Sequence, residues 1–386
     1  MRLHLRRFRL TKAVPLAISR GTTAAVDHLL VEVEHEGITG QGETGGFDTG
    51  HQSFATQALE AELAAVLPRL QGLEPEPLQA LEPLLAPLSP PARCALDLAL
   101  LDWQGKRLGQ PLQRLWGLDS GRAAATSVTL GLGAVPQVLE RLERWWRQLP
   151  ASRIKLKLGS PEGLDHDCAL LDAVATAVDR RRQEHGGPCE LQVDANGGWT
   201  AEAVKRMAPL LLDAEVVLLE QPLPALLDPD ADCEAFAGLD LDCPIPLVAD
   251  ESCWNLSDLL RLAPYVDGVN IKLLKSGGLS EALVMAQAGR RLGLELMLGC
   301  YSDSALLNGA AAQLLPLVRW PDLDSHLNLI DDPFHGPVLV GDRLQAGTGP
   351  GLGVGSRPAA SPANSPADSP AAAGPDGGVG PRAEVI

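Results

Sequence analysis

The sequence lacks the features that mark membrane-spanning, secreted and disulfide-bonded proteins. No run approaches the roughly 20 apolar residues of a membrane span, and the basic first ten residues lead into no apolar leader segment. The seven cysteines are odd in number and scattered, without a C-x-x-C pair, which favours reduced thiols over a disulfide framework or a zinc site. We therefore expect a cytoplasmic protein.

Positive charge is also scarce. The chain has 49 acidic and 32 basic residues, a net charge of −17. Such a charge repels phosphate backbones and anionic lipids, so neither nucleic acid nor a membrane surface is an expected partner. The 386 residues, of which 45% are apolar, are enough for one large core or two domains.

Two patterns of hydrophobic residues divide the chain. Residues 1–35 alternate as strands do and residues 51–106 have helical spacing, which predicts an α+β domain over residues 1–122. Residues 123–325 repeat a strand, loop and helix at intervals of roughly 20 to 37 residues. Eight strands with helical returns predict a (β/α)7β barrel of the TIM type. We expect residues 326–353 to pack back on the first domain.

The remaining segments give weaker signals. Residues 354–386 contain three Ser-Pro pairs among Ala, Gly, Asn and Asp, and we predict a disordered tail. The glycine run at 347–355 follows no clear strand and opens no helix, so we interpret it as a terminal turn rather than a nucleotide loop. The acidic segment at 228–242 has no predicted role.

Three carboxylates each stand where a β-type run stops. Asp194 closes ELQVD, Glu220 closes VVLLE and Asp250 closes PLVAD. The C-terminal strand ends of a barrel meet at one mouth, so these side chains are expected to converge. Three bare anions would repel one another, and a hard divalent cation such as Mg²⁺ would cancel that repulsion and keep positions open for substrate oxygen. The alternative is that each acid is an independent helix cap or loop residue.

The chain has only seven lysines, and four of them fall in two runs, RIKLKLG (153–159) and GVNIKLLKSGG (268–278). Lys155 and Lys157 are two residues apart on the second strand and point to the same side, the barrel interior. Lys272 belongs to the sixth strand, across the mouth. We expect Lys155 and Lys157 to lower each other's pKa, because like-charge crowding and partial burial are what a lysine proton acceptor requires. The alternative is an exposed strand with a polar face.

Taken together, residues 1 to about 353 resemble the enolase superfamily, in its mandelate racemase and muconate lactonizing enzyme branch. The resemblance begins with GQGET (40–44) and LGQPLQRLWG (108–117). It continues, in family order, through Lys-x-Lys, Asp-x-Asn, Glu-Gln-Pro, Ala-Asp-Glu and Asn-Ile-Lys-x-x-Lys-x-Gly-Gly. The resemblance implies a capping domain on the barrel, a bound Mg²⁺ and, as is common in this branch, a homo-oligomer.

The resemblance also implies roles for individual residues. Lys157 and Lys272 would be the paired acid/base lysines, and Lys155 would assist Lys157 and the substrate carboxylate. Asp194, Glu220 and Asp250 would bind Mg²⁺.

The chemistry fits these groups. A proton α to a carboxylate is very weakly acidic, and removing it builds a second negative charge on the carboxylate oxygens as an enediolate, which Mg²⁺ and Lys155 would meet. Returning a proton from the other lysine inverts the carbon, whereas expelling a β-leaving group gives elimination.

Substrate choice depends on residues outside this shared set. Asp322 and Asp324 resemble the Asp-x-Asp pair that holds the α-ammonium of the substrate in dipeptide epimerases; the alternative is a solvated turn. Arg20 resembles an arginine on the mobile capping loop that binds the acidic side chain in Ala-Glu epimerases; the alternative is an ordinary surface arginine. Tyr301 and Asp303 replace the family pattern Gly-x-Met-x-Glu-(Ser/Thr) after the seventh strand, so we expect an altered pocket floor.

The sequence therefore predicts a Mg²⁺-dependent epimerase that acts on dipeptides, of the Ala-Glu type. Alternatives within the same branch are an N-acylamino acid racemase, an o-succinylbenzoate synthase and a muconate cycloisomerase. The acid pair suits the cationic end of a peptide and would serve poorly for the last two substrates. A catalytically silent barrel that acts as a binding module is the third possibility.

Overall fold

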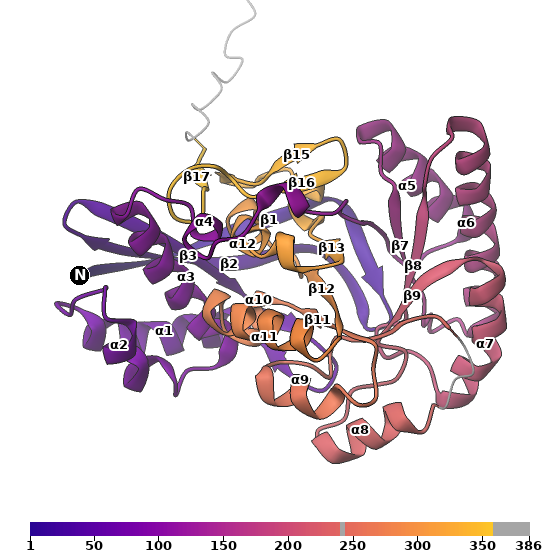
Figure 1. Ribbon diagram of the computed structural model, residues 1–386, viewed down its shortest axis with the longest axis horizontal. Helices are drawn as coiled ribbons and strands as arrows, with labels where there is room; N and C mark the ends of the chain where they lie inside the picture. Colours follow the sequence, from indigo (N-terminus) through magenta and orange to yellow (C-terminus); the bar gives the residue numbers. More distant parts are fainter. Residues whose placement is uncertain (240–243, 358–386) are drawn as a thin grey trace, which may run out of the picture.

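The computed structural model describes residues 1–239 and 244–357 (Figure 1). The predicted disordered tail lies outside the described residues from 358 onward, as do residues 240–242 of the acidic segment. The rest of the acidic segment forms helix α8 (Pro229–Ala237), which the side chain of Asp228 caps. In the part of the chain that the structure describes, no helix is both long and apolar enough to cross a membrane.

The N-terminal region is an antiparallel sheet covered by helices (Figure 1). The sheet has the order β1-β2-β3, and its apolar face packs against the helices around Leu29, Val31 and Val33. The elements are β1 (Arg2–Ile18), β2 (Gly21–His35), β3 (Ile38–Gly45), the short pair β4 (Phe47–Asp48) and β5 (Ser53–Phe54), and helices α1 (Thr56–Leu70), α2 (Leu78–Leu85) and α3 (Pro90–Arg107).

The GQGET motif lies on β3 where that strand touches α3. A Cβ atom at Gly40 or Gly42 would clash with the backbone carbonyl oxygens of Ala99 or Ala95 on the helix. Only glycine permits this approach of helix to strand. The motif therefore has a packing role here.

The second region is an eight-stranded parallel sheet that curls into a barrel. Its order runs without crossing from β13 to β6, and successive strands pair in parallel. Ser127, just before β6, closes the barrel by donating its N–H to the carbonyl of Pro321 on β13 (2.9 Å). The strands are β6 (Val128–Leu130), β7 (Arg153–Lys157), β8 (Glu190–Asp194), β9 (Val216–Glu220), β10 (Leu247–Ala249), β11 (Gly268–Ile271), β12 (Glu295–Gly299) and β13 (Trp320–Asp322).

Helices return the chain between successive strands, as the sequence predicts. Thr200 caps α7 by accepting the N–H of Ala203 (3.2 Å). The helices are α5 (Val135–Gln148), α6 (Leu164–His185), α7 (Ala201–Asp213), α8, α9 (Leu256–Leu262), α10 (Leu273–Ser276), α11 (Leu279–Arg291) and α12 (Ala305–Ala312). The predicted fold class, a TIM-like barrel with an N-terminal α+β domain, is confirmed.

The inside of the barrel changes from apolar to polar along the strands. Leu218, Val248 and Trp320 are buried together in its interior, with Met297. Each of the first three lies two residues before a carboxylate, namely Glu220, Asp250 and Asp322. Because strand side chains alternate, residues two apart face the same side, so these carboxylates lie directly above an apolar plug.

The chain after β13 returns to the N-terminal region. Gly351 pairs with Pro111, beside α4 (Leu112–Leu115), and Leu352 donates its N–H to Asp102 on α3 (2.8 Å). The glycine run forms a turn in which Gly347 and Gly353 touch. The short strands here are β14 (Phe334–His335), β15 (Val338–Val340), β16 (Arg343–Gln345) and β17 (Gly355–Ser356). The domain boundaries at residues 122, 325 and 353 stay predictions.

Candidate active site and metal centre

The three strand-end carboxylates meet at the mouth of the barrel. Asp194 and Glu220 are the last residues of β8 and β9, and Asp250 directly follows β10. One oxygen from each lies within 4.8 Å of the others, and all three residues are fully buried. Asp194 and Glu220 are also register partners in the sheet. Adjacent parallel strands that end at the same level are what bring the three together.

Lysines flank this triad on both sides. Lys157, at the end of β7, donates to Asp194 (2.5 Å), and Lys272, just after β11, donates to Asp250 (2.6 Å). Lys155 lies deeper, with its Nζ 2.6 Å from Glu220 and 3.2 Å from Asp194. Lys275 donates to the other oxygen of Asp250 (2.6 Å). The two lysines predicted as bases thus sit at opposite ends of the triad.

The charges around the triad act unequally on its members. Burial by itself would raise the pKa of Asp194, but Lys157 and Lys155 outweigh it and lower that pKa to about 2. Asp250 behaves likewise, because Lys272 and Lys275 hold its pKa well below the ordinary value. Burial and the neighbouring Asp194 raise the pKa of Glu220 to about 8. The positive charge near Glu220 therefore compensates its burial less than the lysines compensate that of Asp194 and Asp250.

The expectation that crowding and burial lower the pKa is wrong for Lys155. Burial by itself would lower the pKa of Lys155, but Asp322, Glu220 and Asp194 raise it well above the ordinary value. Asp250 does the same for Lys272. The ammonium groups of Lys155 and Lys272 each contact a carboxylate at 2.6 Å, so attraction to the acids, not repulsion between lysines, dominates the pKa shifts of these two residues.

The triad suits a hard divalent cation. Its ligands are three buried carboxylates, the oxygen donors that Mg²⁺ prefers. Glu220 Oε2 is buried and accepts no well-directed hydrogen bond from a described residue; it has only the close ion contact to Lys155. A cation at this place would supply the charge that Glu220 lacks.

Lys157 and Lys272 line one cavity of about 260 Å³ between the barrel and the N-terminal region. Their strands, β7 and β11, are four apart in the eight-stranded barrel, so the lysines approach the cavity from opposite sides. Leu16 and Arg20 cover it from the N-terminal region. The ring of Tyr301 lies 4.5 Å from Lys272 Nζ and forms another part of the wall.

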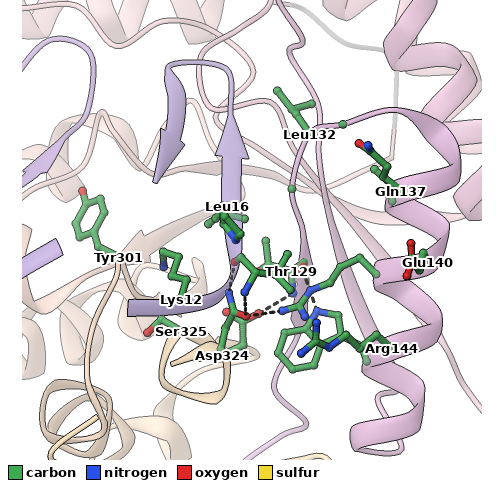
Figure 2. A pocket seen from close by; sticks show the side chains of 18 residues that line it. Lys12, Leu16, Thr129, Leu132, Gln137, Glu140, Arg144, Tyr301, Asp324 and Ser325 are labelled. Atoms are coloured by element: carbon green, nitrogen blue, oxygen red, sulfur yellow. Dashed lines mark hydrogen bonds between the residues drawn. The ribbon is translucent and has the colours of Figure 1, made fainter. Parts of the chain in front are cut away.

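Asp322 and Asp324 are both buried near this cavity but face different neighbours. Asp322 accepts hydrogen bonds from Lys155 and from the hydroxyl of Ser127, each at 2.6 Å. Asp324 accepts the N–H of Thr129 (2.7 Å) and lines a second cavity, shown in Figure 2. Neither is the exposed turn residue that the alternative interpretation required.

Arg20 lies at the mouth but is engaged with the protein. It donates to Glu251 (2.9 Å) and to the carbonyl oxygen of Asn196 (2.7 Å), and its side chain is 21% exposed. Sequence reasoning assigned no role to Glu251 or Asn196, although both belong to the quoted motifs Ala-Asp-Glu and Asp-x-Asn. An acidic substrate side chain would have to compete with Glu251 for this arginine.

The structure places the two residues of the predicted pocket floor differently. Tyr301 lines both cavities, whereas Asp303 lines neither and instead faces His28 and Glu43 of the N-terminal region. The side chain of Asp303 accepts the N–H of Tyr301 (3.2 Å). It therefore acts on the pocket only through the loop that carries Tyr301.

Comparison with known proteins finds the same family that the sequence motifs resemble, over nearly the whole chain. A family model described as "Enolase C-terminal domain-like" matches residues 137–360, and one described as "Mandelate racemase / muconate lactonizing enzyme, N-terminal domain" matches residues 3–117. A hydrophobic dipeptide epimerase from Flavobacteria bacterium (strain MS024-2A) is 34% identical over 88% of this chain and 94% of its own.

Two further proteins extend the comparison. An L-Ala-D/L-Glu epimerase from Escherichia coli K12 is 37% identical over 80% of this chain and 88% of its own. The structure of a dipeptide epimerase from Enterococcus faecalis V583, complexed with Mg and L-Leu-L-Tyr, is 28% identical and superposes with a TM-score of 0.80 over 92% of this chain and 99% of that one. The protein therefore belongs to the mandelate racemase and muconate lactonizing enzyme family of the enolase superfamily.

Proposed function

We propose that this protein is a Mg²⁺-dependent dipeptide epimerase, which inverts the carbon α to the dipeptide's carboxylate. The observation that carries the proposal is the placement of Lys157 and Lys272 on opposite sides of one cavity, each in contact with a different member of the carboxylate triad. Two bases on opposite faces of one carbon are what a two-base inversion requires. The activities of the relatives in E. coli and Flavobacteria support the same reaction class.

Asp194, Glu220 and Asp250 would hold the ion. Bound Mg²⁺ supplies a Lewis acid that polarises the substrate carboxylate and makes the neighbouring C–H more acidic. When the substrate carboxylate enters, Lys155 is near enough to donate to it, because its Nζ already lies 2.6 Å from Glu220. Lys155 thus stabilises the charge that develops as the proton leaves.

The lysines would then move one proton each. Lys157 removes the α-proton from one face, and Lys272 delivers a proton to the other face; the reverse direction exchanges their roles. Each lysine must be neutral to accept a proton, and the contact of Lys272 with Asp250 opposes that by raising the pKa of Lys272. A cation bound to the carboxylate triad would compete for Asp250, so metal binding and lysine activation are expected to be linked.

The free end of the dipeptide would reach Asp322 and Asp324. Asp322 is joined to the triad through Lys155, whose Nζ is 2.6 Å from both Glu220 and Asp322. A dipeptide spans only about 7 Å from its carboxylate to its ammonium group. Both ends of one small substrate can therefore be held by charged groups at this mouth.

The test is deuterium uptake from D₂O into a library of L,L-dipeptides, followed by mass spectrometry with Mg²⁺ and with chelator. We expect Mg²⁺-dependent exchange at the α-carbon of the C-terminal residue. In Lys157→Ala and Lys272→Ala the exchange falls by a factor of about 10² to 10⁴ or becomes specific for one enantiomer. Lys205→Ala, an exposed lysine on α7, is the matched control.

The same library decides between the alternatives. Exchange on N-acylated amino acids without exchange on free dipeptides would contradict the proposal and favour an N-acylamino acid racemase. Exchange that is best with C-terminal glutamate would assign Arg20 to the acidic side chain. Exchange that is best with apolar C-terminal residues would leave Arg20 with Glu251.

A further inference from the structure

A second cavity, of about 340 Å³, adjoins the one that holds the catalytic lysines. The two share Leu16 and Tyr301 in their walls, so these side chains stand between them. Figure 2 shows Lys12, Tyr301 and Asp324 on one side of this cavity and Gln137, Glu140 and Arg144 of α5 on the other. The proposed reaction uses only its inner edge, where Asp324 lies.

Lys12 is the unexplained residue of this cavity. It lies on β1 and is 6% exposed, yet its ammonium group forms no ion pair or hydrogen bond with the residues described, 1–239 and 244–357. Burial lowers its pKa, and Asp324 and Asp303 only partly oppose that. A buried cation without a close partner is costly, and a site that retains one normally pairs it with something.

Two arginines add positive charge to the same cavity. Arg141 and Arg144 are three residues apart on α5 and so lie on one face of the helix. Arg141 stacks over the ring of Trp145, 4.2 Å from its centroid, and donates to Asn328 (3.0 Å). This packing fixes the guanidinium in the wall of the cavity.

The acidic residues of the cavity do not balance these cations. Glu140 is exposed at the outer edge, away from the buried Lys12. Asp324 already accepts the N–H of Thr129, and the proposed function assigns its charge to the substrate ammonium. The inner part of the cavity therefore has a surplus of positive charge beside the position of the dipeptide's free end.

We propose that this cavity binds the side chain of the dipeptide's N-terminal residue, and that Lys12 with Arg141 selects an acidic side chain, aspartyl or glutamyl. The inference rests on the proposed function, because that function places the α-ammonium at Asp324. Leu16 and Lys12 line the same cavity as Asp324, so a side chain beside that ammonium would lie in the cavity that Lys12 lines. An acidic group in the cavity would pair with the Lys12 ammonium, which is accessible from the cavity.

The test compares four substrates that differ only in the first residue: Glu-Leu, Gln-Leu, Ala-Leu and Lys-Leu, or the same set with whichever C-terminal residue the library favours. We measure kcat/KM for α-deuterium exchange and dissociation constants by calorimetry in Mg²⁺. The glutamyl and glutaminyl side chains have nearly the same shape, so their ratio isolates the charge. We expect the wild type to prefer Glu-Leu over Gln-Leu by about tenfold or more, with Lys-Leu the poorest.

Variants locate the preference in the cavity. In Lys12→Met the Glu-Leu to Gln-Leu ratio falls toward one, and in Arg141→Gln it falls partway. Lys205→Met on α7 keeps the wild-type ratio. A wild-type ratio near one overturns the inference, and so does a ratio that survives Lys12→Met.

The two proposals fail in different ways. If Ala-Leu and Gln-Leu exchange as well as Glu-Leu, the epimerase proposal stands and the acidic subsite is wrong. If no dipeptide exchanges, the epimerase proposal is wrong, and the calorimetric ratio of Glu-Leu to Gln-Leu still decides whether Lys12 selects an acidic group.

Discussion

Buried carboxylates lie at two places in this molecule and have different kinds of hydrogen-bond partner. At the interface between the N-terminal region and the barrel, Glu43 on β3 accepts the N–H groups of Ser304 and Leu307 (3.2 Å each) at the start of α12, together with the hydroxyl of Ser304. His28 lies 2.6 Å away on the other side. Two of these donors are backbone N–H groups, which α12 holds in place.

At the barrel mouth the partners of the carboxylates are lysine ammonium groups at the ends of flexible side chains. Lys155 alone reaches Glu220, Asp194 and Asp322. A backbone N–H cannot leave its acceptor, whereas an ammonium can rotate toward a ligand or lose a proton. The comparison indicates that the interface acid holds the two regions together and that the mouth acids remain available for exchange of partners.

The largest expected difference between the mouth acids and the interface acid is in the effect of their substitution on activity. Glu220→Gln keeps the shape of the side chain but removes one charge from the triad, so Mg²⁺ affinity and α-proton exchange should each fall by more than about a hundredfold. Stability without Mg²⁺ should hold or rise, because a buried and undercompensated carboxylate is removed. Thermal melts check this: Mg²⁺ should raise the melting temperature of the wild type and not that of the variant. A metal-dependent shift that persists in the variant would contradict the assignment of Glu220.

The second difference is in stability. Glu43→Gln weakens charged hydrogen bonds to the start of α12, which should lower the free energy of unfolding by about 1.5–3 kcal/mol. Exchange activity per folded molecule should stay within about twofold. Urea denaturation with activity assays measures both, and Glu82→Gln, an exposed acid on α2, should change the free energy of unfolding by less than about 0.5 kcal/mol. Lost activity at unchanged stability would place Glu43 with the mouth acids instead.

The third difference is in the pH dependence of stability. Burial raises the pKa of Asp303 to about 6; His28 opposes this and Glu43 adds to it. The folded-state value exceeds the unfolded one, so the folded protein binds more protons between about pH 4 and 6 and Asp303 costs stability as pH rises through 6. Asp303→Asn should therefore gain up to roughly 3 kcal/mol relative to wild type between pH 4 and 8. Parallel stability profiles for the two proteins would refute the shifted pKa.

Local patterns in the sequence predicted the barrel and the triad, because strand-end carboxylates in a regular βα repeat are positioned by the repeat itself. Asp194, Glu220 and Asp250 needed no knowledge of side-chain contacts. The direction of the pKa shift of Lys155 did, since it depends on the acids that contact the ammonium group, among them Glu220 and Asp322 at 2.6 Å. The position of Lys12 in the same cavity as Asp324 depends on how the N-terminal region docks on the barrel. So does the effect of His28 on the pKa of Asp303. No spacing rule encodes that docking.

One stretch of backbone, residues 12–20 at the end of β1 and the turn after it, borders three cavities at the mouth of the barrel. Lys12 and Leu16 line the second cavity, Leu16 and Arg20 line the cavity of Lys157 and Lys272, and Arg20 lines a further cavity beside Glu251. None of these residues belongs to a barrel strand. Substitutions along this single edge of the N-terminal sheet could therefore change which substrates bind, while the lysines and carboxylates at the barrel mouth stay the same. Exchanging this nine-residue stretch between relatives would therefore alter the substrate range with few substitutions.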